Sequence, residues 1–384
     1  MANERRSRRG ASQQQMSPAL MQERGSQYAY VTQDSLKYKP EAKKKGRAGG
    51  IVLGVLMIVL IAVVIVGTCV FIFLQNINSN LRGSYSDEQM DSIQEKLIPV
   101  TNVNEPFYVM LIGSDARADS DEMGARSDSN ILVRIDPVNW VVTMVSIPRD
   151  TKITYNGSTM KFNSAYSYGG AAGTIEAASE LCGASISHFA EIDFDGVVTL
   201  VDTLGGVEVN VPQPINDPQA GWVTIDNAGL QTLDGAQALV FARSRHYYVD
   251  GDFSRSANQR ALIEAIVKKV FSKPVGDLPG LVQQMSMCVS TDMDVSALYS
   301  LAMQYANSGK SMTIYSIMVP STTAEIDGAS YVIANTSELA EIMAVVDAGG
   351  DPNTVETSGT TSGKFEHYDY IEVDEDTGTY YYSY

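Results

Sequence analysis

Four short segments of this 384-residue chain combine arginine or lysine with aspartate. They read GSDAR over residues 113–117 with RSD over 126–128, PRD over 148–150, KFN over 161–163, and ARSRH over 242–246 running to GDFSR over 251–255. The planar guanidinium group of arginine can donate to two oxygens of one phosphate. The four segments therefore predict a site that binds one or more phosphate groups.

Aspartates accompany these cations, at Asp115, Asp128, Asp150 and Asp252. Carboxylates repel phosphate unless a divalent cation lies between them, and Mg²⁺ is commonly held by one or two carboxylates together with phosphate oxygens. We therefore expect Mg²⁺ at this site, with Mn²⁺ as an alternative. The sequence favours neither a nucleotide site nor a zinc site, because it has no Walker motif, no GxGxxG opening a helix, and no zinc-like spacing of Cys and His.

Cations are scarce outside these segments. Of 28 Lys and Arg and 45 Asp and Glu, residues 1–48 hold eleven and four, which leaves 17 basic and 41 acidic residues for the rest. Seven of those 17 lie in the four segments, and so acidic a body repels nucleic acid. For a single pair such as Arg149 and Asp150, a loop salt bridge explains the pattern equally well. For Arg243, Arg245 and Arg255, the alternative is a solvated helix face.

The elements that position these segments alternate between strand and helix. Apolar runs at 107–112, 130–135 and 141–147 predict buried strands, and ligands of α/β sheets bind at the carboxyl ends of strands. Arg243 and Arg245 would diverge by about 200° on a continuous helix, so we expect a helix end that runs into a loop. We expect further strands at 189–194, 206–212 and 312–319, and helices at 174–181, 197–204, 235–243, 259–270, 295–305 and 337–346. The pattern predicts an α/β domain with a mixed central sheet flanked by helices.

An uncharged apolar run from Ile51 to Leu74 precedes this domain. At ~1.5 Å per residue it would span about 36 Å, more than the ~30 Å hydrocarbon core of a bilayer. We therefore expect one transmembrane helix over residues 50–74. Basic residues (KKKGR, 43–47) lie just before it and acidic residues dominate after it. The positive-inside rule then predicts a single-pass protein of the cell membrane, with a cytoplasmic N-terminus and an extracytoplasmic domain.

Composition divides the remaining chain. We expect a basic, disordered cytoplasmic tail at 1–48, a linker at 75–103, the extracytoplasmic domain at 104–348, and a flexible, acidic and Tyr-rich tail at 349–384. Cys182 and Cys288 could form a disulfide outside the cell, but ordinary buried thiols are the favoured interpretation.

From about Phe107 to Val270 the sequence resembles the LytR-CpsA-Psr (LCP) family. Nine motifs occur in the family's order behind one apolar helix: GSDAR, RSD, VSIPRD, KFNSAYSYGG, EIDFDG, VDTLGGVEV, LDGAQAL, ARSRH and GDFSR. A further resemblance reaches about Ala348. The chain departs from the pattern at Asn258, where members often have Arg, and at Ser254, where Gly is usual.

The resemblance implies the chemistry of LCP enzymes. These enzymes move an anionic glycopolymer, such as a teichoic acid or capsular polysaccharide, from a polyprenyl pyrophosphate carrier to peptidoglycan through a phosphodiester. It implies Mg²⁺ near Asp115 and Asp128, and catalytic roles for Asp115, Arg149 and Asp150. Asp115 would either bind the metal or orient the acceptor. The resemblance places the following residues around the pyrophosphate: Arg117, Arg126, Arg149, Lys161, Arg243, Arg245, Arg255 and Gln259.

Our hypothesis from the sequence is therefore a Mg²⁺-dependent phosphotransferase that joins a glycopolymer to peptidoglycan. Its partners would be the lipid-linked polymer, peptidoglycan and membrane lipid, without nucleic acid. The lipid needs an apolar groove, which residues of the sheet and of 261–270 could line. Three alternatives stay open: a non-catalytic polyprenyl-phosphate binding protein, a membrane-bound regulator, and a pyrophosphate hydrolase in which water replaces the acceptor.

Overall fold

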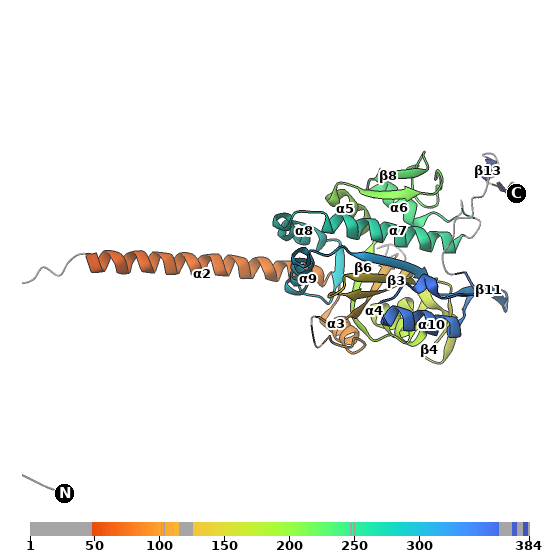
Figure 1. Ribbon diagram of the computed structural model, residues 1–384, viewed down its shortest axis with the longest axis horizontal. Helices are drawn as coiled ribbons and strands as arrows, with labels where there is room; N and C mark the ends of the chain where they lie inside the picture. The colour runs from red at the N-terminus through yellow and green to blue at the C-terminus, as the bar shows by residue number, and fades with distance from the viewer. Residues whose placement is uncertain are drawn as a thin grey trace, which may run out of the picture. The chain divides into compact units, whose positions relative to one another are not determined.

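A six-stranded mixed sheet carries the segments with potential chemistry (Figure 1). The computed structural model describes residues 48–100, 102, 104–114, 126–245, 248, 251–360, 371–374 and 379–382. In spatial order the strands are β10 (Thr313–Met318), β3 (Val141–Ser146), β2 (Ser127–Asp136), β1 (Phe107–Ser114), β6 (Ile186–Asp193) and β9 (Val289–Thr291). The fold class expected from the sequence is confirmed.

Strand directions gather four carboxyl ends at one edge of the sheet. β1 is parallel to β6 and β3 is parallel to β10, while β2 runs antiparallel to both β1 and β3. β1, β3, β6 and β10 therefore all point the same way. The loops that follow these strands, including the PRD segment after β3, start at this edge.

Three helices cover one face of the sheet: α3 (Asp87–Gln94), α4 (Phe162–Cys182) and α10 (Thr336–Asp347) (Figure 1). Their apolar side chains form the largest core with alternate residues of the strands, including Met110, Ile112 and Leu132. Within α4, Gly170 adopts φ 58° and ψ −146°, which interrupts the helix. That backbone conformation favours glycine, since a Cβ atom would be strained there.

The opposite face is covered by α5 (Phe194–Leu204), α6 (Gly235–Arg243) and α7 (Asp252–Phe271) (Figure 1). Ile263 of α7 packs against Ile131 and Val133 of β2. α5, α6 and the hairpin of β7 (Val207–Val211) and β8 (Gly229–Leu233) share a second core around Val201 and Phe241.

Aspartates at the helix starts fix these helices in place. Asp193 caps α5 by accepting from the Gly196 amide at 2.7 Å, and Asp202 accepts from the Gly235 amide at 2.8 Å. A cap of this kind satisfies a backbone donor that the helix itself leaves unpaired. Asp193 of the EIDFDG motif thus fixes the start of α5, and Asp202 of the VDTLGG motif fixes the start of α6, which ends at Arg243.

The remaining elements lie around this two-faced sheet. They are the hairpins β4 (Lys152–Tyr155) with β5 (Ser158–Lys161) and β11 (Ser321–Ile326) with β12 (Ala329–Ala334), the helices α8 (Leu278–Met285) and α9 (Val295–Ser308), and the pair β13 (Ile371–Asp374) with β14 (Thr379–Tyr382). Cys182 and Cys288 are free thiols, as the sequence favoured.

A long apolar helix, α2 (Ala48–Leu81), precedes the domain. Within it Val59–Leu81 is long and apolar enough to cross a membrane, and no other helix of the described residues is. Most of its large apolar side chains up to Leu74 are more than half exposed, which water disfavours and lipid does not. The helix fits a single-pass membrane anchor. Its last turn packs through Ile77 and Leu81 against Val295 of α9.

Two segment boundaries differ from the prediction. Residues 75–103 do not form a plain linker, because α3 buries Met90 and Ile93 in the main core. The domain also continues past residue 348, since Pro352 is buried and Thr360 donates to the Ser321 carbonyl at 3.0 Å. α3 is short and mostly polar, so composition alone suggested a linker there. The tail at 1–47 lies outside the described residues.

Close packing of α6 on α5 predicts a stability difference between two glycines. A Cβ atom at Gly235 would lie 2.3 Å from the Val198 carbonyl oxygen, whereas one at Gly280 of α8 would meet nothing within 4 Å. We expect Gly235→Ala to destabilise the full chain by about 1–3 kcal/mol through overpacking. Gly280→Ala should instead stabilise it by about 0.4–1 kcal/mol. Urea unfolding followed by fluorescence of the buried Trp140 measures both, and equal stabilities would contradict the packing described here.

Candidate active site

Arg149 is the centre of an ion cluster at the carboxyl edge of the sheet. Its Nη1 donates to Oδ1 of Asp128 at 2.8 Å. Its Nε lies 3.5 Å from Oδ1 of Asp252 and 3.8 Å from Oδ2 of Asp150. One guanidinium group from the loop after β3 thus holds carboxylates from β2, from its own loop and from the first turn of α7.

Two more cations join the same carboxylates. Nη2 of Arg255 lies 3.0 Å from Oδ1 of Asp252, one turn earlier on α7, and also donates to the Asp128 carbonyl at 3.2 Å. Nζ of Lys161, at the end of β5, lies 2.8 Å from Oδ1 of Asp150. Three cations from three sequence segments therefore share three carboxylates, as the clustering of motifs predicted.

Burial acts on the two arginines in different ways. For Arg149, burial opposes the charge, but Asp252, Asp128 and Asp150 outweigh it, and the pKa is raised. For Arg255, burial dominates and lowers the pKa, with only partial compensation from Asp252 and further lowering by Arg149 and Arg245. A buried guanidinium whose charge is only partly compensated is stabilised by an incoming anion. Arg255 therefore strengthens the case for phosphate binding.

Arg245 and Arg243 leave the end of α6 in the way expected from their spacing. The helix ends at Arg243 and Ser244 is extended. Arg243 donates to the Ala220 carbonyl at 3.0 Å, with its guanidinium 4.3 Å from the ring centre of Phe194. The backbone amide of Arg245 donates to the buried carboxylate of Asp217. The loop between β7 and β8 thus fixes both arginines, which the sequence gave no sign of.

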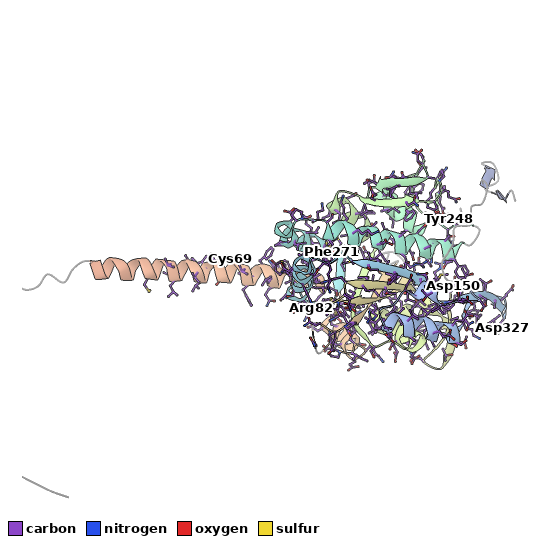
Figure 2. All side chains as sticks on the ribbon, viewed as in Figure 1. Cys69, Arg82, Asp150, Tyr248, Phe271 and Asp327 are labelled. Carbon is purple, nitrogen blue, oxygen red and sulfur yellow. The ribbon has the colours of Figure 1, made fainter. Side chains whose placement is uncertain are left out.

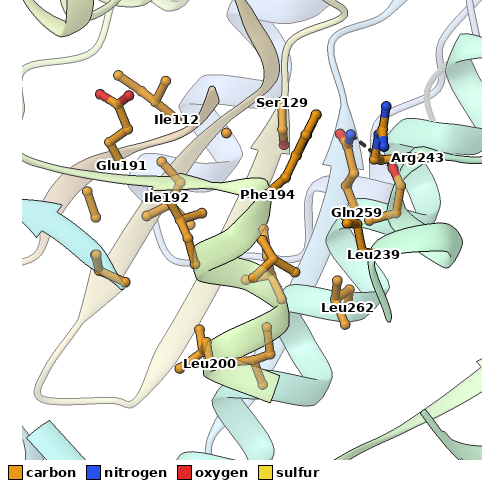
Figure 3. Close-up of a pocket in the computed structure, with 18 residues that line it drawn as sticks. Ile112, Ser129, Glu191, Ile192, Phe194, Leu200, Leu239, Arg243, Gln259 and Leu262 are labelled. Atoms are coloured by element: carbon orange, nitrogen blue, oxygen red, sulfur yellow. Dashed lines mark hydrogen bonds between the residues drawn. The ribbon is translucent and has the colours of Figure 1, made fainter. Parts of the chain in front are cut away.

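An apolar pocket of about 190 Å³ opens beside this cluster (Figure 3). Side chains from β1, β6, α5 and α7 line it, among them Leu111, Ile192, Phe194, Val197, Leu262 and Ile266. Arg243 and Gln259 supply polar groups to its wall, and in Figure 3 they lie together at one side of the apolar lining. The groove expected for a lipid chain is therefore present on the α7 face of the sheet.

Helix α7 connects the cluster to the pocket. Arg255 belongs to the cluster, Gln259 follows one turn later, and Leu262, Ile263 and Ile266 reach the apolar lining. Residues three, four and seven apart lie on one helix face, so this face changes from charged to apolar along its length. Figure 2 shows Tyr248 and Asp150 near the end where α7 begins and Phe271 at the other end. A molecule with an anionic head and an apolar chain matches that order.

The other expected site residues fall into three groups. Arg126 is exposed just before β2. Gln259 donates to the Ala242 carbonyl at 3.3 Å, which joins α7 to α6. Asp115 and Arg117 lie outside the described residues.

Ser254 and Asn258, the two residues that depart from the family pattern, are both buried and contribute to packing. Ser254 is buried in the first turn of α7. Asn258 is fully buried and its side-chain amide donates to the Phe241 carbonyl at 3.0 Å and to the Tyr248 hydroxyl at 3.1 Å. An arginine at Asn258 would have to displace these contacts, so the neutral residue joins α7 to α6 instead of adding a cation.

Arg260 and Glu191 were not anticipated from the sequence. Arg260 is buried, which lowers its pKa to about 10, and it donates to hydroxyl groups of Ser146 and Ser316 at the ends of β3 and β10. The Glu191 carboxylate accepts from the hydroxyl groups of Tyr85 and Tyr166. Both sets depend on contacts between distant segments, and neither follows from a local motif.

The carboxylates of the cluster are of the type that Mg²⁺ prefers. In the part of the chain described, no group of three or more His, Cys, Asp or Glu forms a metal site made of protein ligands alone. An ion held by Asp128 together with substrate phosphate oxygens fits this donor set. Asp115, the second expected ligand, is not among the described residues.

An ion cluster beside an apolar pocket, in an α/β domain that follows a helix fit for a membrane anchor, defines a domain suited to an anionic amphiphile. The chain belongs to the LytR_cpsA_psr family, whose model matches residues 71–346. It is 29% identical over 298 residues to the polyisoprenyl-teichoic acid–peptidoglycan teichoic acid transferase TagU of Enterococcus faecalis, covering 76% of this chain and 94% of the relative.

Two solved structures share the fold. Bacillus subtilis TagV aligns with a TM-score of 0.56 and 26% identity, over 64% of this chain and 97% of TagV. A structure of TagT bound to LI-WTA aligns with a TM-score of 0.55 and 26% identity, over 67% of this chain and 96% of TagT.

The ion cluster predicts that inorganic pyrophosphate stabilises the full chain against heat. Arg149→Met should weaken pyrophosphate binding by roughly 10- to 150-fold, since a hydrogen bond to a charged group contributes about 1.5–3 kcal/mol. Arg82→Met is the matched control, because Arg82 pairs with Asp87 on the exposed surface. Thermal unfolding at increasing pyrophosphate concentrations measures both variants. Equal stabilisation of Arg149→Met and wild type would show that the cluster is only a structural ion network.

Proposed function

We propose that this chain transfers a glycopolymer phosphate from a polyprenyl pyrophosphate carrier to peptidoglycan. The observation that carries the proposal is the sequence of groups along α7: Arg255 belongs to the ion cluster, and Leu262 and Ile266, two to three turns later, line the apolar pocket. A prenyl pyrophosphate likewise has a charged pyrophosphate at one end and an apolar prenyl chain after it. The name of the Enterococcus relative supports polymer and acceptor of this kind.

The reaction is a displacement at phosphorus. An acceptor hydroxyl oxygen forms a bond to the glycan-side phosphorus, and the bond from that phosphorus to the bridging oxygen breaks. The bridging oxygen takes the electron pair and leaves as polyprenyl phosphate, and the proton of the acceptor hydroxyl passes through solvent to this leaving phosphate. Negative charge on the two phosphates raises the barrier to attack by the acceptor. Positive groups that are already oriented toward the phosphates therefore contribute most to lowering that barrier.

The described cations suit that role. Arg149 and Arg255 are held in place by Asp128 and Asp252 before any substrate arrives, so little reorganisation is needed. Asp150 holds both Arg149 and Lys161 and acts by positioning them. Arg243 and Gln259 lie at the pocket wall, where the prenyl chain would meet its phosphates.

We further propose that Mg²⁺, or Mn²⁺ in its place, binds at Asp128 and Asp115 when the substrate is present. The ion would neutralise phosphate charge, which explains why carboxylates and phosphate can share one site. The basic flank before α2 supports a cytoplasmic N-terminus and an extracytoplasmic domain, where peptidoglycan is found.

The test is reconstitution of the full chain in detergent with a lipid-linked glycopolymer, peptidoglycan oligomers and Mg²⁺. We expect a polymer–peptidoglycan adduct that disappears with EDTA and returns with Mg²⁺ or Mn²⁺. Arg255→Lys should lower the turnover rate by about 10²–10³, because lysine cannot reproduce a bidentate donor in a preorganised site. Arg82→Lys, on the exposed surface, serves as the control.

Each alternative gives a different result in this assay. Release of free polymer phosphate without an adduct would identify a hydrolase. Retention of the intact lipid with no turnover would identify a binding or regulatory protein. Either result, repeated with several lipid-linked polymers, would overturn the transfer reaction.

A further inference from the structure

A second pocket, of about 460 Å³, lies next to the apolar one and differs from it in polarity. Its lining is mainly polar and includes Tyr85, Ser114, Tyr166, Glu191, Asp195 and Thr199. None of the described residues that line this polar pocket is Lys or Arg. The reaction proposed above assigns no role to it.

Helix α5 is the wall between the two pockets. Phe194, Val197 and Leu200 line the apolar pocket, whereas Asp195, Gly196 and Thr199 line the polar one. Residues three or four apart share a face of a helix, so α5 presents one apolar and one polar face. The amphipathic helix thus keeps an apolar ligand and a polar ligand apart at a short distance.

Both pockets reach the end of β1. Gly113 lines the apolar pocket and Ser114, the last residue of β1, lines the polar one. Ser114 pairs with Asp193 of β6 on one side and with Ser127 of β2 on the other. The polar pocket therefore lies at the β6 side of β1 and the ion cluster at the β2 side, with Ser114 between them.

The wall of the polar pocket is held by hydrogen bonds between distant segments. The Glu191 carboxylate accepts from Tyr166 of α4 at 2.6 Å and from Tyr85, which follows α2. Burial raises the pKa of both phenols, and the nearby carboxylate raises it further, so both remain donors near neutral pH. In Figure 3 the Glu191 carboxylate points away from Arg243 and Gln259.

The lining defines the class of ligand. Carboxylates, hydroxyl groups and amides without a cation repel an anionic polymer but accept hydrogen bonds from the hydroxyl and amide groups of a neutral sugar. We propose that the polar pocket binds the acceptor, a neutral, hydroxyl-rich cell-wall glycan, and places its attacking hydroxyl group at the end of β1. This proposal rests on the transfer reaction proposed above.

The arrangement also suits the direction of the reaction. The attacking and leaving oxygens of a phosphoryl transfer lie roughly in line on opposite sides of the phosphorus. The prenyl chain lies in the apolar pocket on one side of α5, so the leaving oxygen is on that side of the phosphorus. An acceptor in the polar pocket approaches from the other side of α5.

Thr199→Trp tests the pocket, since Thr199 is exposed in its wall and bonds only the Asp195 carbonyl among described hydrogen bonds. The probe is a peptidoglycan fragment of alternating N-acetylglucosamine and N-acetylmuramic acid whose lactyl carboxyl groups are amidated, so that it is neutral; it is added to the full chain in detergent without donor. We expect Thr199→Trp to weaken fragment binding about tenfold or more by steric overlap. In the transfer assay the acceptor KM should rise by a similar factor while the donor KM stays within about twofold.

Two further variants keep the outcome interpretable. Asp195→Asn removes one carboxylate with little change of shape and should weaken fragment binding by about two- to fivefold. Thr354→Trp is the matched control, because Thr354 is also exposed, bonds the Asp351 carbonyl in the same way and lies outside the polar pocket. Its fragment binding should equal that of wild type.

The experiment distinguishes failure of the acceptor pocket from failure of the transfer reaction. Equal fragment binding by Thr199→Trp, Thr354→Trp and wild type would overturn the acceptor pocket and leave the transfer reaction intact. Fragment binding that Thr199→Trp weakens, without any transfer by wild type, would support the pocket and overturn the reaction.

Discussion

The arginines of this site must stay charged in a partly buried place before any substrate arrives. Burying a guanidinium group without a partner of opposite charge costs free energy, and the neighbouring aspartates offset that cost. Arg149 illustrates the balance, since Asp252, Asp128 and Asp150 outweigh the effect of its burial. Arg255 is less well compensated, because burial dominates there. A phosphate bound at Arg255 would offset the part of its charge that the aspartates leave uncompensated, so the cluster suits an anionic ligand.

The fold serves this constraint by placing segments that are far apart in sequence at one sheet edge. Parallel β1, β3 and β6 all end there, and antiparallel β2 begins there, which brings Asp128 to Arg149. Helices α5 and α7 then separate the environments along their faces. α7 runs from the cations to the apolar pocket, and α5 divides that pocket from a polar one.

Much of this arrangement follows from local sequence. Apolar runs ending in charged motifs placed β1, β3 and the PRD loop after β3 correctly, and the two-residue spacing of Arg243 and Arg245 located the end of α6. Long-range contacts could not be predicted. The helix expected at 174–181 begins much earlier, at Phe162, whose amide donates to the Thr151 carbonyl. The roles of Asp217, Arg260 and Glu191 depend on partners from other segments, for which periodicity gives no signal.

The central claim is that one ligand occupies the cluster and the apolar pocket together. A polyprenyl pyrophosphate with a photoreactive group on its prenyl chain, bound to the full chain in detergent, tests it most directly. We predict that mass spectrometry of the crosslinked peptides finds label on residues 194–200 of α5 and 259–266 of α7, and that unlabelled prenyl pyrophosphate competes for it. Labelling confined to α2, or labelling that the competitor leaves unchanged, would contradict the account.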